Sequence, residues 1–287
     1  MKLSIITINL NNKEGLIRTI ESVRNQTFRD FEHIVIDGAS TDGSLEVIKK
    51  YKDGFSFWVS EKDAGIYNAM NKGIEAAKGE YTLFLNSGDW LYADNVLARV
   101  FKNSFDEDIV SCGCHNVYPN KTYSIDKYPP KKISLYSLHN CSLSHPSTFI
   151  RRELFNRTSL YDESYRIISD WAFFVQSLIC NNCSYSYLDI LVTTFVCDGI
   201  SSNTSASTVI KNESDDYISK NYPRVWNDYF MDECVFNTIR WIYNQNIFFR
   251  NVIIFPFRVF NSLFKLRTNL GNKKRIQKIK ATKLIMQ

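Results

Sequence analysis

The sequence predicts an α/β protein with a mixed, mainly parallel β-sheet flanked by helices. The first observation is that short apolar, β-branched runs alternate with segments of helical periodicity over about the first hundred residues. The second is that the loops after the predicted strands are rich in glycine and aspartate, as in "VIDGASTDGS" (35–44) and "FLNSGDW" (84–90). In a parallel sheet such loops meet at one edge, where α/β proteins bind their ligands.

The N-terminal elements follow in a regular order. The first strand, 2–10, is apolar at nearly every position, which is typical of a strand covered by helices on both faces. Ser44 or a nearby Asp is expected to cap the second helix, and Gly79 is expected to end the third. The alternation then predicts helices at 13–26, 44–52 and 66–79, and strands at 55–61 and 80–86. A further strand is predicted within 31–44, where it ends in a Gly- and Asp-rich loop.

The pattern changes after about residue 105. A strand is predicted at 108–118, and the segment 121–155 is less periodic. An amphipathic helix is expected from about Ser169, and a strand from 185 towards 201. The polar stretch 201–208 is predicted to be a loop and 209–245 to be helical.

Composition excludes several classes of protein. The formal net charge of +5 is too small to indicate a nucleic-acid partner. Neither a G-x-G-x-x-G nor a P-loop pattern follows the first strand, where the sequence is "NLNNKEG". The seven cysteines are scattered and no secretory signal is visible, so we expect reduced thiols and a cytoplasmic protein. The Cys180-Asn-Asn-Cys183 spacing lacks a second pair, which argues against zinc.

Four aspartates fall in the loops after the predicted strands: Asp37, Asp42, Asp63 and Asp89. Asp89 stands beside Gly88, where backbone and ligand can approach closely. A carboxylate there suits Mg²⁺ or Mn²⁺ that also binds substrate phosphates. The alternative is that Asp89 caps the next helix.

The stretches "SIITINLNNKEGLIRTIESVRNQTFRDFEHIVIDGASTDGS" (4–44) and "SEKDAGIYNAMNKGIEAAKGEYTLFLNSGDWL" (60–91) closely resemble family 2 glycosyltransferases of the branch that builds bacterial surface polysaccharides. The resemblance covers about residues 2–100. It continues more weakly in "HPSTFIRRELF" (145–155), "ISDWAFF" (168–174) and "FVCDGIS" (195–201). The family implies a Rossmann-like GT-A fold, a UDP- or GDP-type nucleotide-sugar donor, Mn²⁺ or Mg²⁺, and inversion at the sugar carbon.

The resemblance also implies roles for individual residues. Asp89 matches the last acid of the family's DxD motif and would bind the metal, whereas Ser87 replaces the first acid. Asp42 would brace its loop or touch the nucleoside. The other residues implied for the donor side are Thr7, Asn9 and Asp37 near the base or ribose, Asp63 near the ribose or donor sugar, and Asn71 and Lys72 holding the adjoining loop and helix.

On the acceptor side, Asp170 in "SDWAFF" matches the second acid of the family's acid pair and would be the general base. The alternative is an acid favoured at a helix N-terminus. His145 is expected to contact phosphate, metal or acceptor, or else to be a hydrogen-bonded structural residue. Arg151 is expected to face phosphate or solvent, and Trp171 to stack on a sugar or pack beside the site.

The C-terminal segment 241–287 interleaves aromatic and basic residues, with Pro256 breaking its longest apolar run. It is expected to lie on an anionic inner-membrane surface or to pack on the catalytic domain. The expected organisation is a catalytic domain over 1–240, with a nucleotide-sugar-binding half (1–105) and an acceptor half (106–240), followed by this helical extension.

The expected activity is hexosyl or N-acetylhexosaminyl transfer in capsule, O-antigen or exopolysaccharide assembly. The acceptor would be a glycan or an undecaprenyl-type lipid-linked sugar, and the protein would be peripheral to the membrane. Two alternatives stay open: a non-catalytic nucleotide-sugar-binding scaffold and a sugar nucleotidyltransferase, although the latter's Gly-rich phosphate loop is missing.

Overall fold

The computed structural model describes residues 1–118, 123–140, 142–197 and 206–223. One compact unit comprises Met1–Tyr217, and a second begins at Ile218. The predicted boundary at residue 240 and the extension 241–287 lie outside the described residues.

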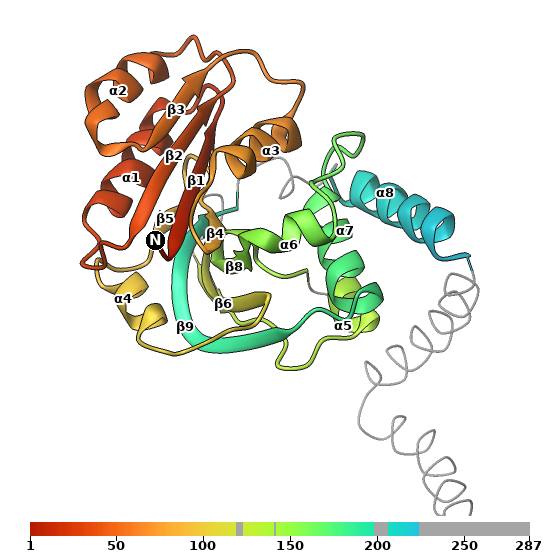
Figure 1. Cartoon of the computed structure of the whole chain (residues 1–287). Helices are drawn as coiled ribbons and strands as arrows, with labels where there is room; N and C mark the ends of the chain where they lie inside the picture. Colours follow the sequence, from red (N-terminus) through yellow and green to blue (C-terminus); the bar gives the residue numbers. More distant parts are fainter. Residues whose placement is uncertain (119–122, 141, 198–205, 224–287) are drawn as a thin grey trace, which may run out of the picture. The chain divides into compact units, whose positions relative to one another are not determined.

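The helices and strands follow the labels of Figure 1. The strands are β1 (Leu3–Asn9), β2 (Phe31–Asp37), β3 (Phe57–Ser60), β4 (Tyr81–Phe84), β5 (Trp90–Leu91), β6 (Ile109–Val117), β7 (Ser124–Lys127), β8 (Thr148–Arg151) and β9 (Tyr185–Val196). The α-helices are α1 (Lys13–Arg24), α2 (Ser44–Tyr51), α3 (Ile66–Ala76), α4 (Val96–Phe101), α5 (Leu135–Asn140), α6 (Arg152–Arg157), α7 (Ser169–Val175) and α8 (Ala206–Asn221). Short helical turns are η1 (Lys52–Gly54), η2 (His145–Ser147) and the π-helical η3 (Gln176–Cys180).

The strands form one mixed sheet in the order β3-β2-β1-β4-β8-β6-β9-β5, with β7 paired to β6. The first four strands are parallel, as the alternating pattern predicted. Strand β8 runs antiparallel to both β4 and β6, and β9 is parallel to β6. The sheet is therefore parallel in the half formed by β3, β2, β1 and β4 and mixed beyond it, which confirms the predicted fold class.

Strand β1 is the centre of the parallel half, and all seven of its residues are buried. Helices α1 and α2 cover one face of this part of the sheet and α3 covers the other (Figure 1). Helix α3 approaches β1 very closely because Gly73 has no side chain: a Cβ there would lie 2.4 Å from Ile6 Cγ2. This close contact fixes α3, which carries several residues of the site described below.

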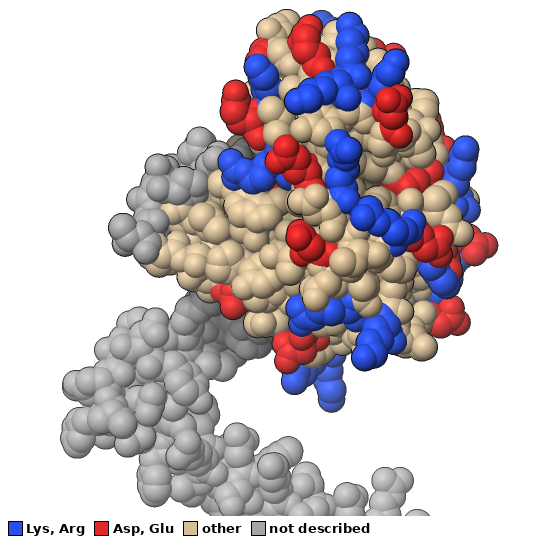
Figure 2. Space-filling view, turned by 90° about the vertical axis from the view of Figure 1, so that its left-hand side faces the viewer, with Lys and Arg blue, Asp and Glu red and all other residues tan. Residues whose placement is uncertain are grey.

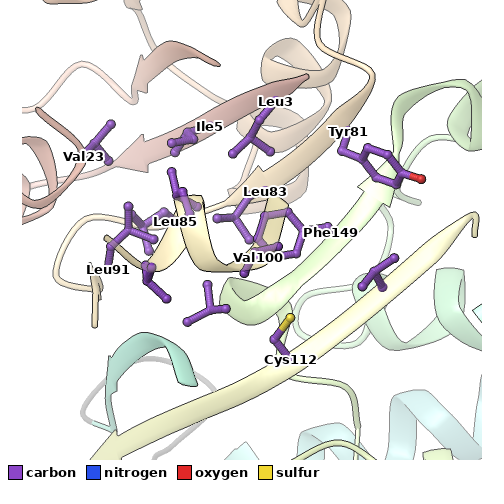
Figure 3. Packing of buried hydrophobic residues seen from close by; sticks show 14 residues of the cluster. Leu3, Ile5, Val23, Tyr81, Leu83, Leu85, Leu91, Val100, Cys112 and Phe149 are labelled. Atoms are coloured by element: carbon purple, nitrogen blue, oxygen red, sulfur yellow. The ribbon is translucent and has the colours of Figure 1, made fainter. Parts of the chain in front are cut away.

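A hydrophobic cluster joins the two halves of the sheet (Figure 3). Its members come from β1, α1, β4, β5, α4, β6, β8 and β9, so residues far apart in the chain share one core. Each fully buried Leu, Ile or Phe of this kind contributes about 1.5–3 kcal/mol of transfer free energy. The side chains labelled in Figure 3 are Leu3, Ile5, Val23, Tyr81, Leu83, Leu85, Leu91, Val100, Cys112 and Phe149.

Two local predictions are corrected. The N-cap of α2 is Gly43, in a left-handed conformation with φ 93°, rather than Ser44. Asp42 assists instead, because its Oδ1 accepts a hydrogen bond from the Ser44 N–H. Helix α3 ends at Ala76, before Gly79. Gly79 is needed for another reason, since a Cβ at this position would lie 2.5 Å from the Ser4 nitrogen of β1.

The surface drawn in Figure 2 shows Lys and Arg side chains interspersed with Asp and Glu, without an extended field of one sign. Within the four described segments, we find no helix whose length and apolar character would let it cross a bilayer.

His33 in β2 predicts a pH-dependent stability. Burial lowers the pKa of His33 from 6.5 to about 3, and its Nε2 lies 3.0 Å from Thr7 Oγ1. The unfolded chain binds a proton below about pH 6.5 and the folded protein does not, so stability is highest above that pH and falls as the pH drops towards 3. This residue should lower the free energy of unfolding by up to about 1.4 kcal/mol per pH unit in that window.

The measurement is urea denaturation at about pH 7, 6 and 5 for the wild type and His33→Gln, which retains a polar partner for Thr7. The variant should lose this part of the pH slope. An identical slope in both proteins would assign the effect to another group, such as the buried His145.

Candidate functional site

The first part of the site lies where β1, β2 and β3 end. Asp37 closes β2 and is fully buried. Its Oδ1 accepts hydrogen bonds from Asn9 Nδ2 at 2.7 Å and from Ser40 Oγ at 2.6 Å. Its Oδ2 accepts one from Ser60 Oγ at 2.6 Å. The strand register places Asn9, Asp37 and Ser60 side by side, so one carboxylate ties three strand ends to the loop after β2.

Thr7 and Asp42 support the same region in different ways. Thr7 is fully buried, and its hydroxyl pairs with His33 inside the sheet. Asp42 is exposed; its Oδ2 accepts from Lys13 N at 2.8 Å and its Oδ1 from Ser44 Oγ at 2.6 Å. The Ser44 hydrogen bond is the largest cause of the lowered pKa of Asp42. Asp42 therefore braces the loop between β2 and α2 against the start of α1.

Asp63 lies next to this loop. Its Oδ1 accepts a hydrogen bond from Lys72 Nζ at 2.6 Å, and its Oδ2 would lie 3.1 Å from a Cβ built on Gly38. Lys72 also pairs with Glu61 at 2.6 Å, and hydrogen bonding to Asp63 is the first cause of the raised pKa of Lys72. The ion pair thus links α3 to the loop after β3.

The loop at 86–89 is held by α1. Gly88 adopts φ 106°, a left-handed conformation that glycine reaches without steric cost. The Thr19 hydroxyl accepts from Gly88 N at 3.1 Å and donates to the Asp89 carbonyl at 2.6 Å. Asn12 Nδ2 donates to the Ser87 carbonyl at 2.9 Å. These contacts set the backbone that carries Asp89.

Asp89 is buried, with 5% of its surface exposed. The Val196 N–H, at the end of β9, donates to its Oδ1 at 3.4 Å. Trp90 follows immediately and packs under the Arg18 guanidinium, 4.8 Å from the ring centroid. The carboxylate therefore sits between the loop after β4 and the end of β9.

Asp89 could hold a divalent cation if a bound phosphate group supplied further ligands to the same ion. Among the described residues, no group of three His, Cys, Asp or Glu side chains could hold a metal by itself. Mg²⁺ and Mn²⁺ sites on nucleotide substrates often use one or two carboxylates, with phosphate and water supplying the remaining ligands. Two buried amide oxygens at this edge, Asn9 Oδ1 and Asn86 Oδ1, have no hydrogen-bond partner among the described residues.

The second part of the site is centred on Asp170 at the start of α7, where its side chain is half-buried. The Tyr67 hydroxyl donates to Asp170 Oδ1 at 3.0 Å and also contacts the Ile167 carbonyl. Burial, reinforced by the Asp170 carboxylate, raises the pKa of both Tyr67 and Tyr161. Both phenols therefore stay protonated, and the Tyr67 hydroxyl serves as a hydrogen-bond donor to the carboxylate.

Behind Asp170 lies a layer of aromatic side chains. His145 is buried, stacks on Phe84 with ring centroids 4.6 Å apart, and its Nε2 lies 2.8 Å from Tyr161 Oη. Burial lowers the pKa of His145, against a smaller opposing effect of Asp170. Asn71 holds this layer to α3, since its amide donates to the Tyr161 carbonyl at 2.9 Å and accepts from the Tyr161 N–H at 3.0 Å.

A short path of contacts connects the two parts. Asp89 directly precedes β5, which pairs with β9. In β9, the Thr193 hydroxyl donates to the Pro146 carbonyl. His145 precedes Pro146 and lies within electrostatic range of Asp170. Asp89 is thus linked to β9, and Asp170 is linked through Tyr67, Tyr161 and His145 to η2.

Arg151 lies away from the site, which corrects the expectation that it faces phosphate or solvent, whereas Trp171 takes the packing role that was one of its two expected roles. Arg151 pairs with Tyr81 at the amino end of β4, opposite the edge that carries Asp89. Its guanidinium binds Asp106 Oδ1 at 2.6 Å, Tyr81 Oη and Glu80. Trp171 is buried, and its Nε1 donates to the Leu138 carbonyl at 3.0 Å, so the ring packs between helices.

Sequence reasoning missed Thr19, Asn12 and Tyr67. Thr19 lies on the buried face of α1. A polar residue among the apolar positions of a helix needs a hydrogen-bond partner inside the protein, and this pattern could have drawn attention to Thr19. Tyr67 stands in the quoted motif "DAGIYNAMNKG", but no spacing rule connects it to a residue 103 positions later.

This sheet, with its acidic loops at the carboxyl ends of the parallel strands, is a GT-A type glycosyltransferase fold. The family model for glycosyl transferase family 2 matches residues 4–172, more than half of the chain. The chain belongs to that family.

The chain is also similar to individual relatives. An uncharacterised glycosyltransferase of Mycobacterium tuberculosis is 32% identical over 182 residues, covering 62% of this chain and 69% of the relative. A PGL/p-HBAD biosynthesis glycosyltransferase of Mycobacterium bovis is 28% identical over 211 residues, covering 70% of this chain and 79% of the relative.

Among solved structures, S. aureus TarS 1-349 in complex with UDP-GlcNAc matches with a TM-score of 0.60 and 21% identity, over 76% of this chain and 67% of TarS 1-349. The mannosyltransferase PcManGT from Pyrobaculum calidifontis, in complex with GDP-Man and Mn²⁺, matches with a TM-score of 0.57 and 15% identity, over 76% of this chain and 63% of its own. In the TarS 1-349 complex with UDP, the match spans 60% of the solved chain. At these identities the likeness supports the fold alone.

The Thr19 contacts predict a stability effect. Thr19→Val retains the shape of the side chain but leaves the partly buried Gly88 N–H and the buried Asp89 carbonyl without the Thr19 hydroxyl. We expect it to lower the free energy of unfolding by about 1–3 kcal/mol, as measured by urea denaturation. Thr19→Ser, which retains the hydroxyl, should recover most of the loss. Equal destabilisation by both variants would mean that methyl packing, rather than the hydrogen bonds, supports the loop.

Proposed function

We propose that the protein transfers a single sugar, a hexose or N-acetylhexosamine, from a UDP- or GDP-type nucleotide sugar to a glycan or lipid-linked acceptor. The observation that most supports this proposal is that a family 2 fold carries a buried Asp89 in the loop after β4 and a half-buried Asp170 at the start of α7. TarS and PcManGT, which share the fold, were solved with UDP-GlcNAc and GDP-Man.

The nucleoside would bind at the ends of β1, β2 and β3. Asp37 has both oxygens engaged within the protein, so its contribution would be to shape the loop that faces base and ribose. Asn9 would act in the same way, because its amide donates to Asp37 and Ser40. Thr7 and Asp42 would support this wall, and the Asp63–Lys72 pair would border the ribose and donor sugar.

The diphosphate would lie near Ser87, Gly88 and Asp89. A Mn²⁺ or Mg²⁺ ion held by Asp89 and the diphosphate would offset the charge that develops on the leaving group. The Gly88 backbone leaves room for phosphate to approach, and α1 keeps the loop in place through Thr19.

Asp170 would act as the general base. The acceptor hydroxyl oxygen attacks the anomeric carbon and the bond from that carbon to the diphosphate oxygen breaks, inverting the configuration. The hydroxyl proton passes to Asp170, and the nucleoside diphosphate leaves. The Tyr67 hydrogen bond occupies Oδ1 and leaves Oδ2 to face the acceptor. Asn71 and His145 would support Asp170 from behind through Tyr161.

The proposed acceptor and the proposed location of the protein are supported by the sequence of the C-terminal segment and not by the fold. The basic, aromatic segment within 241–287 suits peripheral attachment to an anionic membrane, where an undecaprenyl-type lipid-linked acceptor of capsule, O-antigen or exopolysaccharide assembly would be found. One relative is named for PGL/p-HBAD biosynthesis.

A product assay separates this proposal from its alternatives. Sugar transfer releases a nucleoside diphosphate, a nucleotidyltransferase would release pyrophosphate, and a binding scaffold would release neither. The assay incubates the full chain with UDP-GlcNAc or GDP-mannose and Mn²⁺ and separates the nucleotides by chromatography. Pyrophosphate as the main product would overturn the proposal.

The base assignment predicts that Asp170→Asn lowers kcat by about 10²–10⁴-fold, the contribution of a positioned general base. The midpoint of thermal unfolding should change little, because Asn retains the shape of the side chain and an oxygen that can accept from Tyr67. Nucleoside diphosphate release measures kcat, and Asp53→Asn, an exposed carboxylate after α2, is the matched control. Full turnover by Asp170→Asn would remove Asp170 from the mechanism.

The metal assignment predicts a ligand-dependent thermal shift. Nucleotide sugars at 100 times their Kd should stabilise the wild type by about 2.7 kcal/mol, and more strongly with Mn²⁺ than without it. Asp89→Asn should lose the Mn²⁺-dependent part, whereas Asp170→Asn should retain it. If Asp89→Asn responds to Mn²⁺ like the wild type, the ion binds elsewhere.

A further inference from the structure

The segment 166–170, which leads into α7 and carries Asp170, is held from one side by Glu213 of α8. Its Oε1 accepts from Arg166 N at 2.9 Å, and its Oε2 accepts from Ile167 N at 3.0 Å and Ile168 N at 3.3 Å. N–H groups before and within the first turn of a helix have no intrahelical acceptor, and the helix dipole favours a negative charge there. Glu213 therefore caps this segment with one carboxylate.

The same segment is held from the other side by Tyr67 of α3. Its hydroxyl contacts the Ile167 carbonyl and donates to Asp170 Oδ1 at 3.0 Å. Tyr67 is itself buried in a helix fixed against β1. The peptide before α7 is thus bound through its N–H groups by α8 and through a carbonyl by α3, and the Asp170 side chain shares the second contact.

The other groups around Asp170 complete this arrangement. Tyr161 and His145 form the layer behind it, joined by a 2.8 Å hydrogen bond, and both lie within electrostatic range of Asp170. Tyr217, one turn after Glu213, donates to the Ala172 carbonyl at 3.2 Å and packs edge-on against Trp171. Two successive turns of α8 therefore hold this region: Glu213 binds the segment before α7, and Tyr217 contacts α7 itself.

We propose that Tyr67 and Glu213 are positioning residues that clamp the segment 166–170 and hold the Asp170 carboxylate towards the acceptor hydroxyl. The inference rests on the proposed function, because it assigns these residues to the reaction through Asp170. Neither residue touches donor or acceptor in this assignment. Their loss should slow the chemical step and leave donor binding unchanged.

The experiment measures kcat and KM for donor hydrolysis, followed as nucleoside diphosphate release from UDP-GlcNAc or GDP-mannose with Mn²⁺ and water as the acceptor. Both variants retain the shape of the side chain. Tyr67→Phe removes the hydroxyl, and Glu213→Gln removes the negative charge and replaces one accepting oxygen by an NH₂ group that cannot accept from a backbone N–H. We expect kcat to fall roughly tenfold or more, a part of what a positioned base contributes, while KM for the donor changes less than about twofold.

Two matched controls separate positioning from general destabilisation. Tyr81→Phe removes another buried tyrosine hydroxyl, which donates to the Glu107 carbonyl at 2.8 Å at the amino end of β4. Asp108→Asn alters another carboxylate that accepts a backbone N–H, that of Ser184 at 3.1 Å. Both should lower the thermal midpoint and leave kcat unchanged. A reduced kcat in the controls equal to that in the clamp variants would overturn the inference.

A second measurement needs no activity. Hydrogen–deuterium exchange of the peptide covering 164–170 should accelerate about tenfold or more in Glu213→Gln, the factor expected for a lost hydrogen bond to a charged group, and also rise in Tyr67→Phe. Unchanged exchange in both variants would refute the clamp even if the enzyme is active. Accelerated exchange in a protein that releases no nucleoside diphosphate would support the clamp and reject the proposed function.

Discussion

Asp37 is a fully buried carboxylate at the centre of the polar edge of the sheet, and burying such a charge is tolerable only when hydrogen bonds surround it. The parallel register supplies them, because Asn9 and Ser60 end neighbouring strands at the same level. The same requirement recurs at two other places: the Thr19 hydroxyl bonds to the backbone of the loop that carries Asp89, and the Asn71 amide bonds to the backbone of Tyr161. In each case a neighbouring element supplies the hydrogen-bond partner that a buried polar group needs.

The parallel half of the fold could be predicted because each of its elements has its own periodicity and the strands all point the same way. These two features, periodicity and a common strand direction, were enough to predict that Asp37, Asp63 and Asp89 lie at one edge of the sheet. Arg151 was misplaced because β8 runs antiparallel to β4, so its last residue lies at the opposite edge. Strand direction in the second half depends on long-range pairing, which no local pattern of residues reports.

His145 and Trp171 show a related limit. Both stand in motifs of the family, yet both rings are buried in packing layers, His145 between Phe84 and Tyr161 and Trp171 beneath Leu138. Polar ring atoms that find partners inside the protein are satisfied without a ligand. A sequence motif therefore identifies a residue but not the orientation of its side chain, which depends on the helices and strands packed around it.

The match to the family model ends at residue 172, two positions after Asp170. The groups that hold the helix bearing Asp170 come partly from beyond that limit, since Glu213 and Tyr217 belong to α8. The family segment therefore contains Asp89 and Asp170, the carboxylates of the proposed site, but only part of the structure that orients Asp170. Because Glu213 binds three consecutive N–H groups, a shift of α8 would move the start of α7 and the Asp170 carboxylate with it. The geometry of the proposed base is thus a joint property of α3 and α8, one inside the family segment and one outside it.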